Sequence, residues 1–329
     1  MMILRIARLT VVLALLFFIA PRAVEGQRAA VPAIGFLSSA SAEPFAPFVA
    51  AFRDGLNDAG YLEGRNVTIE FAWAGGRYDR LPALAEAPVA RKVAVIVAAG
   101  GAVAALAAKA ATSAIPIVIA IGDDPVKFGL VSNLSRPEGN ITGVTLFIDV
   151  LTPKRFELLA ELVPAAPLTM LVNPQNPNAK TETRDAREAA GKTQRGLRIL
   201  EASNDDQIAA AFATIATQPG AALMIGTDPF FYARHRRIIE LAARHSVPAI
   251  HFHRGFAIAG GLISYGATIT TEYRTAGLYT GRLLSGEKPS NLPIVQPTKF
   301  ELVINMKTAK VLGLTIPPSL LLRADQVIE

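Results

Sequence analysis

The chain has 329 residues, of which 51% are hydrophobic and 18% are charged, and it contains no cysteine. This length and apolar fraction suit two domains of ordinary size with two cores, and they exclude an intrinsically disordered chain. The net charge of +6 comes from scattered basic residues, and the densest cluster, 234–237, has a helical pattern typical of a solvated face, so we expect no nucleic-acid partner.

The first residues have the pattern of an export signal. Arg5 and Arg8 precede an apolar run over 9–20, which is about half the ~20 residues that a spanning helix needs, and small residues before Gln27 suit cleavage. We therefore predict a cleaved signal peptide at 1–26 rather than an uncleaved anchor helix. Its removal takes away three arginines and one glutamate and lowers the net charge from +6 to +4. Without a cysteine to carry a lipid, the mature protein is expected to be free in the periplasm.

The chain after the signal alternates between short apolar strands and helices. In 102–111 alanine, the best helix former, predominates, while the runs 93–98 and 115–121 are rich in β-branched residues or alanine. This stretch predicts a right-handed βαβ unit with parallel strands, whose carboxyl ends open into the crevice where ligands of α/β sheets bind. The other predicted elements of this first set are strand 33–37, a helix with its apolar face over 45–56, strand 67–72 and strand 140–146.

The same alternation repeats in the second half of the chain. Thr152 and Pro153 suit the N-cap and first position of a helix, and the predicted strands that follow are 168–172, 198–201, 222–225, 249–252, 262–264 and 300–304. The sequence thus predicts an α/β fold with two Rossmann-like lobes that have parallel sheets. We assign 31–146 and 262–297 to the first lobe, and 147–261 and 298–329 to the second. Several chain crossings then join the lobes as a hinge.

Several motifs resemble those of the ABC-transporter substrate-binding family often labelled tryptophan/tyrosine-type. They are GYLEGRN at 60–66, GRYDRLP at 76–82, GGLISYG at 260–266 and QPTKFELVIN at 296–305, with further similarity through 307–310 and 316–318. The resemblance covers essentially the whole mature chain. It implies a type I periplasmic binding protein, in which two lobes close on a small molecule and deliver it to a membrane permease. The family label implies an amino acid ligand, aromatic amino acids in particular.

The chain departs from the family pattern at two places near the expected ligand. The family commonly opens the central helix with a hydroxyl residue and a proline, whereas this chain has Gly101, Ala102 and Val103. The family's Gly-Asp-Pro-Val turn has two aspartates here, Asp123 and Asp124. An anion at this helix must therefore rely on backbone amides alone.

An amino acid ligand would need partners for both of its charges. Its carboxylate is expected at the amides of Ala102 and Val103, after Gly101, where the helix dipole favours an anion. Its ammonium group is expected at Asp123 or Asp124 from the first lobe and at Asp228 from the second. Asp228 is the favoured candidate because it lies in the second lobe. A ligand that contacts only one lobe does not shift the equilibrium between the open and closed forms.

Neutral and apolar contacts complete the predicted site. Candidates for hydrogen bonds are Ser38, Ser39, Asn173 and Asn176, and candidates for an apolar wall are Phe230 and Tyr265. The polar residue types among them are also common helix caps and turn formers, so each has a structural interpretation as well.

Other classes of function have weaker support in the sequence. The G-x-S-x-G, H-E-x-x-H, P-loop and G-x-G-x-x-G motifs are absent, so we expect no enzyme activity and no cofactor. His251 and His253 lie two residues apart, but no third metal ligand is evident, so we expect no metal. We expect a monomer whose partners are a small ligand and an ABC permease. The open alternatives are a periplasmic sensory module that reports to a membrane receptor, and a binder of small carboxylates rather than amino acids.

Overall fold

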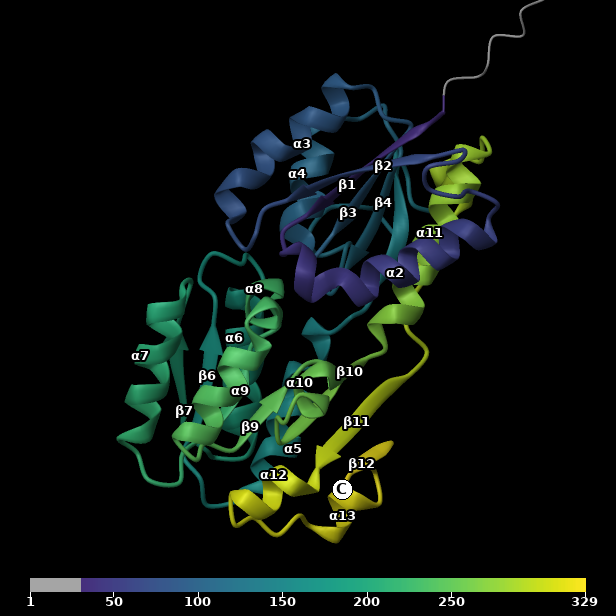
Figure 1. Cartoon of the computed structure of the whole chain (residues 1–329). Helices are drawn as coiled ribbons and strands as arrows, with labels where there is room; N and C mark the ends of the chain where they lie inside the picture. The colour runs from purple at the N-terminus through teal and green to yellow at the C-terminus, as the bar shows by residue number, and fades with distance from the viewer. Residues whose placement is uncertain (1–30) are drawn as a thin grey trace, which may run out of the picture. The chain divides into compact units, whose positions relative to one another are not determined.

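The computed structural model of this chain describes residues 31–329, and the predicted signal peptide lies outside the described residues. Residues Pro32–Glu329 form one compact unit. Within residues 31–329, no helix is long and apolar enough to cross a membrane. The unit contains two β-sheets, each covered by helices (Figure 1).

The first sheet has five strands, all parallel, in the order β2-β1-β3-β4-β5. The strands are β1 (Ala33–Ser38), β2 (Thr68–Trp73), β3 (Val95–Ala99), β4 (Ile117–Ile121) and β5 (Ile141–Thr145). Helices α3 (Leu81–Ala90) and α4 (Ala102–Ala111) cover one face, and α2 (Ala42–Asp58) and α11 (Ile269–Leu284) cover the other (Figure 1). Every residue of β3, β4 and β5 is buried, as continuous apolar runs predict for a parallel sheet. We call this sheet and its helices lobe 1.

The second sheet has seven strands in the order β12-β11-β10-β9-β8-β6-β7. Its strands are β6 (Leu168–Val172), β7 (Leu197–Glu201), β8 (Ala222–Ile225), β9 (Ala249–His251), β10 (Ile263–Ala267), β11 (Phe300–Asn305) and β12 (Gln326–Ile328). Its helices are α5 (Thr152–Leu162), α6 (Ala179–Lys192), α7 (Asp205–Ala216), α8 (Pro229–Ala233), α9 (His235–Arg244), α10 (Arg254–Ile258), α12 (Met306–Val311) and α13 (Pro318–Leu321). We call this sheet and its helices lobe 2. Short 3₁₀ helices occur at η1 (Tyr78–Arg80), η2 (Asp149–Leu151) and η3 (Pro289–Asn291).

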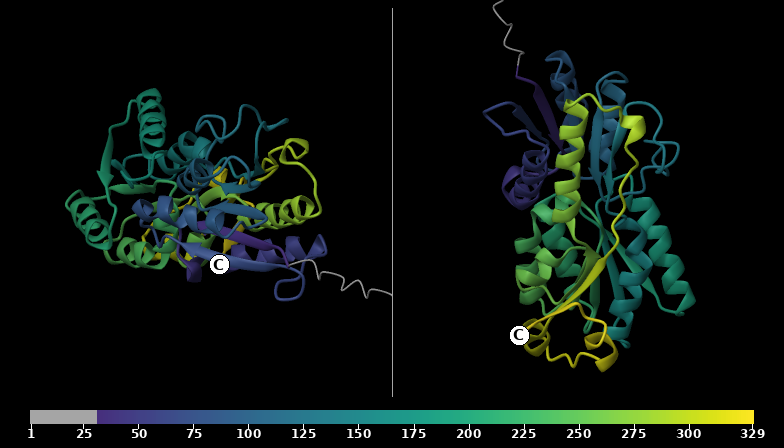
Figure 2. Two further views of the ribbon diagram at one scale, coloured as in Figure 1. Left: turned by 90° about the horizontal axis from the view of Figure 1, so that it is seen from above. Right: turned by 90° about the vertical axis from the view of Figure 1, so that its right-hand side faces the viewer.

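The chain crosses between the lobes after β5, after β10 and before β11. The last crossing starts beside lobe 1, where Val295 bridges Val144, and its extended chain leads down to β11 (Figure 2, right). Because the chain re-enters lobe 2 from the side of lobe 1, β11 runs antiparallel to β10. The other neighbouring strands of this sheet are parallel, so the prediction of parallel sheets is correct apart from this pair.

Strand β10 corrects the assignment of 262–297 to the first lobe. Ile263 is in register with Ile250 of β9 and with Ile304 of β11, so β10 belongs to the seven-stranded sheet. The chain leaves lobe 2 only after Ala267, because the pairing with β11 continues to that residue, which is in register with Phe300. Helix α11 and the stretch to Val295 do pack with lobe 1.

The packing of α2 on α11 shows how sequence spacing builds lobe 1. The buried residues of α2 include Phe45, Phe48, Phe52 and Leu56, which is the apolar face that the sequence predicts. Glycine allows the two helices to approach closely, since a Cβ at Gly277 would lie 2.0 Å from the carbonyl oxygen of Phe52. Any larger residue at Gly277 would therefore force α11 away from α2.

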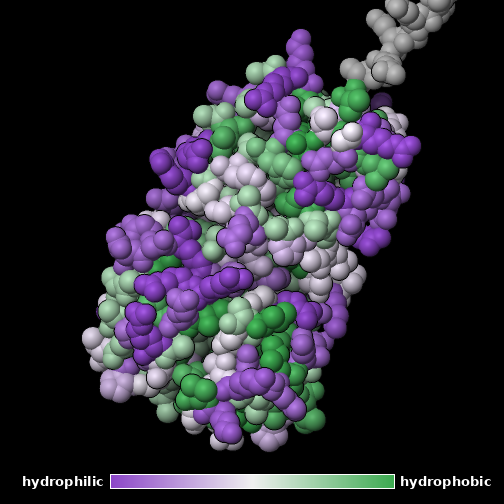
Figure 3. Space-filling view, viewed as in Figure 1, coloured by the Kyte–Doolittle hydropathy of each residue, from purple (hydrophilic) through white to green (hydrophobic). Residues whose placement is uncertain are grey.

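The face of the unit shown in Figure 3 is largely hydrophilic, with hydrophobic residues scattered between the charged ones. The most exposed large hydrophobic side chains of the described residues are Leu322, at 89%, and Val311, at 82%. Isolated apolar residues of this kind are ordinary on protein surfaces.

Candidate functional site

A cavity lies between the lobes, where the strands of both sheets end. Loops after β3, β4 and β5 reach it from lobe 1, and loops after β6, β8 and β9 reach it from lobe 2. The volume of the cavity is ≈ 50 Å³, which is enough for a few waters. The cavity therefore belongs to a closed arrangement in which both lobes contribute walls.

Five aromatic side chains contribute to the walls of this cavity. Ring centroids of Phe48 and Tyr232 lie 5.3 Å apart across the lobes, and those of Phe48 and Tyr273 are also 5.3 Å apart. Phe45 and Phe252 complete the aromatic lining. Sequence reasoning missed all five as site residues and interpreted Phe45 and Phe48 as core. The available signal was position, because both lie in the first two turns of the helix that follows β1.

Asp228 is the best-connected polar residue of the cavity. It follows β8 and caps α8, where its Oδ1 accepts hydrogen bonds from the amide of Phe230 at 2.6 Å and the hydroxyl of Tyr78 at 2.5 Å. Its Oδ2 accepts from Nδ2 of Asn176 at 2.9 Å. Burial raises the pKa of Asp228 to about 6, although these donors oppose the shift because they favour the charged form.

Asp123 faces the same cavity from lobe 1. Its Oδ2 accepts a hydrogen bond from the amide of Ala102 at 2.6 Å, at the start of α4. Burial, and then the charge of Asp149, raise the pKa of Asp123 to about 8. The amide of Ala102, predicted to bind a ligand carboxylate, is thus already paired with a carboxylate of the protein.

The structure separates the two adjacent aspartates. Asp124 forms the turn after β4, where its Oδ1 accepts a hydrogen bond from the amide of Val126 at 2.9 Å, and it does not line the cavity. Asp123 does line it. The question that the sequence left open is therefore answered geometrically in favour of Asp123.

The candidates at the end of β1 and just after it form hydrogen bonds with backbone groups. Ser39 donates a hydrogen bond to the carbonyl of Gly100, and Ser38 accepts one from the amide of Ala40 at 3.2 Å. Gly101 lines the cavity with a left-handed φ of 95°, whereas Val103 does not line it. Neither serine faces the cavity, so their observed contacts are those of loop-forming residues.

The remaining candidates divide between the cavity and the scaffold. Asn176 lines the cavity, while Asn173 is buried beside it and accepts a hydrogen bond from the amide of Gln175 at 3.1 Å. Phe230 points away and lies under the guanidinium of Arg234, 3.8 Å from the ring centroid. Tyr265 packs near Phe300 at 6.3 Å between centroids. Neither aromatic residue forms the predicted apolar wall, because α8 and β10 direct them elsewhere.

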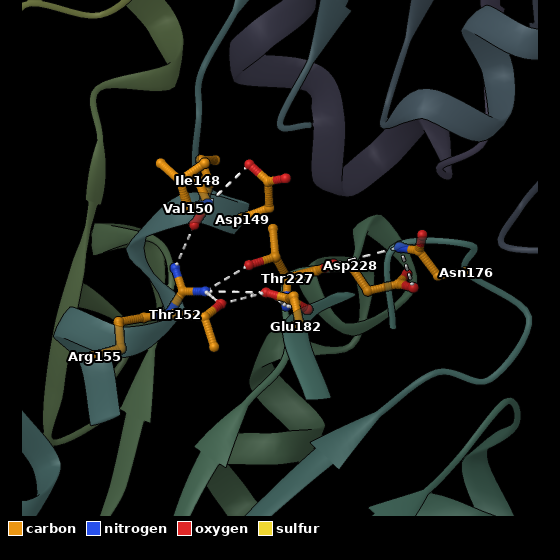
Figure 4. Close-up of polar contacts among 9 residues, drawn as sticks. All are labelled: Ile148, Asp149, Val150, Thr152, Arg155, Asn176, Glu182, Thr227 and Asp228. Carbon is orange, nitrogen blue, oxygen red and sulfur yellow. Dashed lines mark hydrogen bonds and ion pairs between the residues drawn. The ribbon is translucent and has the colours of Figure 1, made fainter. Parts of the chain in front are cut away.

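A buried ion pair supports the loop that carries Asp228 (Figure 4). Nη2 of Arg155 lies 3.1 Å from Oε1 of Glu182 and donates to the hydroxyl of Thr227 at 2.8 Å. Glu182 in turn accepts the amide of Thr227 at 2.9 Å. Nη1 of Arg155 donates to the carbonyl of Ile148, in the first crossing between the lobes, at 3.0 Å. The network therefore fixes both the loop before Asp228 and the chain that enters lobe 2.

The same network overturns the predicted role of Thr152. Its hydroxyl donates to Oε1 of Glu182 at 2.9 Å, and Thr152 is already the first residue of α5 rather than its N-cap. Because η2 leads directly into α5, Thr152 has helical dihedral angles (φ −53°, ψ −46°) rather than the extended ones usual for an N-cap.

The histidine pair does not form a metal cluster. His251 stacks on Phe256 at 4.4 Å between centroids, and Nδ1 of His253 accepts the amide of Gly255 at 3.1 Å. Burial lowers the pKa of both rings to about 3, so both are neutral at physiological pH. Within residues 31–329 no group of three or more candidate ligands is placed to hold a metal ion.

Tyr78 joins the lobes, since it comes from η1 of lobe 1 and donates to Asp228 of lobe 2. We predict that Tyr78→Phe opens the unliganded protein, because a hydrogen bond to a carboxylate contributes about 1.5–3 kcal/mol and this one forms only between closed lobes. Small-angle X-ray scattering is expected to give a larger radius of gyration for the variant.

The control for this prediction is Tyr61→Phe, which removes a hydroxyl that contacts only Ser285 within lobe 1. Scattering curves that are identical for Tyr78→Phe, Tyr61→Phe and the parent protein would show that the Tyr78 bond does not hold the lobes together.

Two α/β lobes with mainly parallel sheets, joined by chain crossings and enclosing a cavity at their strand ends, define the type I periplasmic binding protein fold. Residues 37–328 match the family described as ABC transporter substrate binding protein. The chain belongs to this family, which confirms the resemblance seen in the sequence motifs.

Individual relatives agree with this assignment. A "Tyrosine-binding protein" of Clostridioides difficile (strain R20291) is 26% identical over 268 residues, which are 80% of this chain and 75% of that protein. A conserved domain protein of Vibrio cholerae has a TM-score of 0.80 at 24% identity, over 90% of this chain and 99% of that one. An ABC domain from Streptococcus pneumoniae in complex with L-Trp has a TM-score of 0.78 at 24% identity, over 90% and 100%. At 24% identity, the similarity to these two solved structures supports the assignment of the fold alone.

Proposed function

We propose that this protein is the extracytoplasmic solute-binding component of an ABC importer, which captures a small molecule between its lobes and delivers it to the permease. In this proposal the signal peptide is cleaved, and the mature protein acts in the periplasm as a monomer without a lipid anchor. It works as a binder and not as an enzyme, with no cofactor, metal or nucleic acid.

The observation that carries the proposal is the cavity built by both lobes. A ligand that contacts Asp123 of lobe 1 and Asp228 of lobe 2 gains both contacts only when the lobes are closed. Differential affinity of this kind shifts the population toward the closed form. A permease that recognises the closed form then receives loaded protein.

The lining supports a ligand with a positive charge and a ring. Carboxylates are the natural partners of an ammonium group, and the two aspartates supply them from opposite sides. The aromatic walls suit a planar apolar group, which they contact on its faces and edges. Aromatic amino acids belong to this class, in line with the tyrosine-binding relative, whereas simple carboxylates carry no cation for the aspartates.

A thermal-shift screen of residues 27–329 tests this function. We expect aromatic molecules with an ammonium group to raise the melting temperature, because a ligand at 100 times its Kd stabilises the folded state by about 2.7 kcal/mol. Simple aromatic carboxylates serve as the control and are expected to leave the melting temperature unchanged. If only the carboxylates stabilise the protein, the assignment of the aspartates to a cationic group is wrong.

A further inference from the structure

We propose that the cavity of this chain selects an aromatic amine that has no free carboxylate, in preference to the corresponding amino acid. This inference rests on the proposed function and narrows the class of ligand. It follows from which charges line the cavity and from which hydrogen-bond donors are already used.

The charges that line the cavity have one sign. Its carboxyl groups are those of Asp123 and Asp228, and no lysine, arginine or histidine is among its lining residues in the described chain. A bound amine meets two potential counterions there. A bound carboxylate meets none, and an anion that is buried without a partner is strongly disfavoured.

The nearest buried cation is committed elsewhere. Arg155 is fully buried, and its Nη1 and Nη2 groups donate to Ile148, Thr152, Glu182 and Thr227. It does not line the cavity. Its Nε has no hydrogen-bond partner, but because Arg155 does not line the cavity, a ligand carboxylate there does not contact the guanidinium.

The helix terminus that suits an anion is also occupied. The amide of Ala102 at the start of α4 donates to Oδ2 of Asp123, so a carboxyl group of the protein already occupies the position that would suit a ligand anion. The chain has no hydroxyl side chain at Gly101, Ala102 or Val103 to offer a substitute. Across the cavity, Nδ2 of Asn176 donates to Asp228. Two donors near the cavity, the amide of Ala102 and Nδ2 of Asn176, are thus used within the protein.

The carboxyl groups of the cavity retain acceptor sites that an ammonium group can use. A carboxylate has about four lone-pair sites, and one hydrogen bond to Asp123 is present, from Ala102. Asp228 accepts three, from Tyr78, Phe230 and Asn176. The aromatic faces of Phe48, Tyr232 and Tyr273 can then take the ring and add cation–π attraction.

Calorimetric titration of residues 27–329 with matched pairs tests the inference. The pairs are tyramine and L-tyrosine, tryptamine and L-tryptophan, and phenethylamine and L-phenylalanine, and each pair differs by one carboxylate. We expect each amine to bind at least about tenfold more tightly than its amino acid, since charge-assisted contacts are worth at least that factor.

Two neighbouring substitutions locate the effect. Asp123→Asn keeps an oxygen for the amide of Ala102 but removes the carboxyl group that a bound ammonium would favour in its ionised form, and it is expected to weaken amine binding by about tenfold or more. Asp124→Asn removes the same charge one residue away, keeps the turn to Val126, and is expected to change the Kd by less than about twofold. Unchanged melting temperatures identify folded variants.

The possible results separate the two levels of the proposal. Amino acids that bind as tightly as their amines, or equal losses in Asp123→Asn and Asp124→Asn, overturn the inference and leave the solute-binding function intact. If neither member of any pair binds, both the inference and the assignment of an aromatic ammonium ligand fail together.

Discussion

Asp228→Asn is expected to weaken ligand binding by about 2–5 kcal/mol, which is a factor of roughly 30 to several thousand in Kd. The substitution removes the lobe 2 charge that faces a cationic ligand. It also replaces one of the two acceptor oxygens with an NH₂ group. This matters because Tyr78, Phe230 and Asn176 all donate hydrogen bonds to this side chain. Calorimetry with the tightest ligand from the thermal-shift screen measures the loss.

The choice of asparagine isolates binding from folding. Asparagine caps helices as well as aspartate does, so the start of α8 is expected to survive, and circular dichroism melting checks this. Asp206→Asn, at an exposed position in the first turn of α7, is the charge-matched control and is expected to bind normally. An affinity for Asp228→Asn equal to that of this control would remove Asp228 from the site.

Arg155→Met is expected to destabilise the fold by about 3–5 kcal/mol, because it leaves Glu182 buried without its counterion. For a protein of this size the melting temperature is expected to fall by roughly 5–15 °C. Differential scanning calorimetry measures the change. Arg184→Met, which breaks the exposed pair with Asp185, is the control and is expected to cost less than about 1 kcal/mol.

The loss of folding stability in Arg155→Met is expected to depend on pH. Burial raises the pKa of Glu182, whereas the charge of Arg155 lowers it, so removing Arg155 raises it further. A carboxyl whose folded pKa is raised contributes its stability below its unfolded pKa and loses it as pH rises through its folded pKa. The deficit of the variant should therefore be smallest at acidic pH, where Glu182 is protonated in both proteins, and grow as pH rises above about 7, which is the folded pKa of Glu182 in the parent protein.

The double variant Arg155→Met with Glu182→Gln gives a second check. A neutral side chain removes the buried charge, so much of the lost stability is expected to return. If the double variant were as unstable as Arg155→Met well above pH 7, where Glu182 of the single variant ionises, the lost packing and hydrogen bonds of Arg155, rather than the unpaired carboxylate, would be the cause.

Most of the fold follows from local patterns. Alanine in 102–111 predicts α4 with the bounds that the structure has, and the apolar runs 168–172 and 222–225 coincide with β6 and β8. These predictions succeed because strand and helix periodicity depend on neighbouring residues. The strand at 262–264 overlaps β10, but its assignment to the first lobe was wrong, because pairing with β9 and β11 is a relation between distant segments, which composition does not report.

The site was predictable only in part for the same reason. Polar residues after strands pointed to Asp123, Asn176 and Asp228, all of which line the cavity. Tyr78 and the aromatic walls were missed, because a residue on a helix looks like core until the facing lobe is known. The side chains of Ser38, Ser39 and Asn173 form hydrogen bonds with backbone groups. Serine and asparagine commonly have this structural role, so their presence alone does not indicate ligand contact.

Sequence alone was sufficient for the two-lobed α/β architecture and for the family, because strand and helix periodicity and the motifs are local. Only the tertiary structure decided which aspartate faces the cavity, which amide of α4 is already bonded, and that Arg155 pairs with Glu182. These outcomes depend on which donors and acceptors meet when distant strand ends converge. That convergence is set by sheet order and lobe packing.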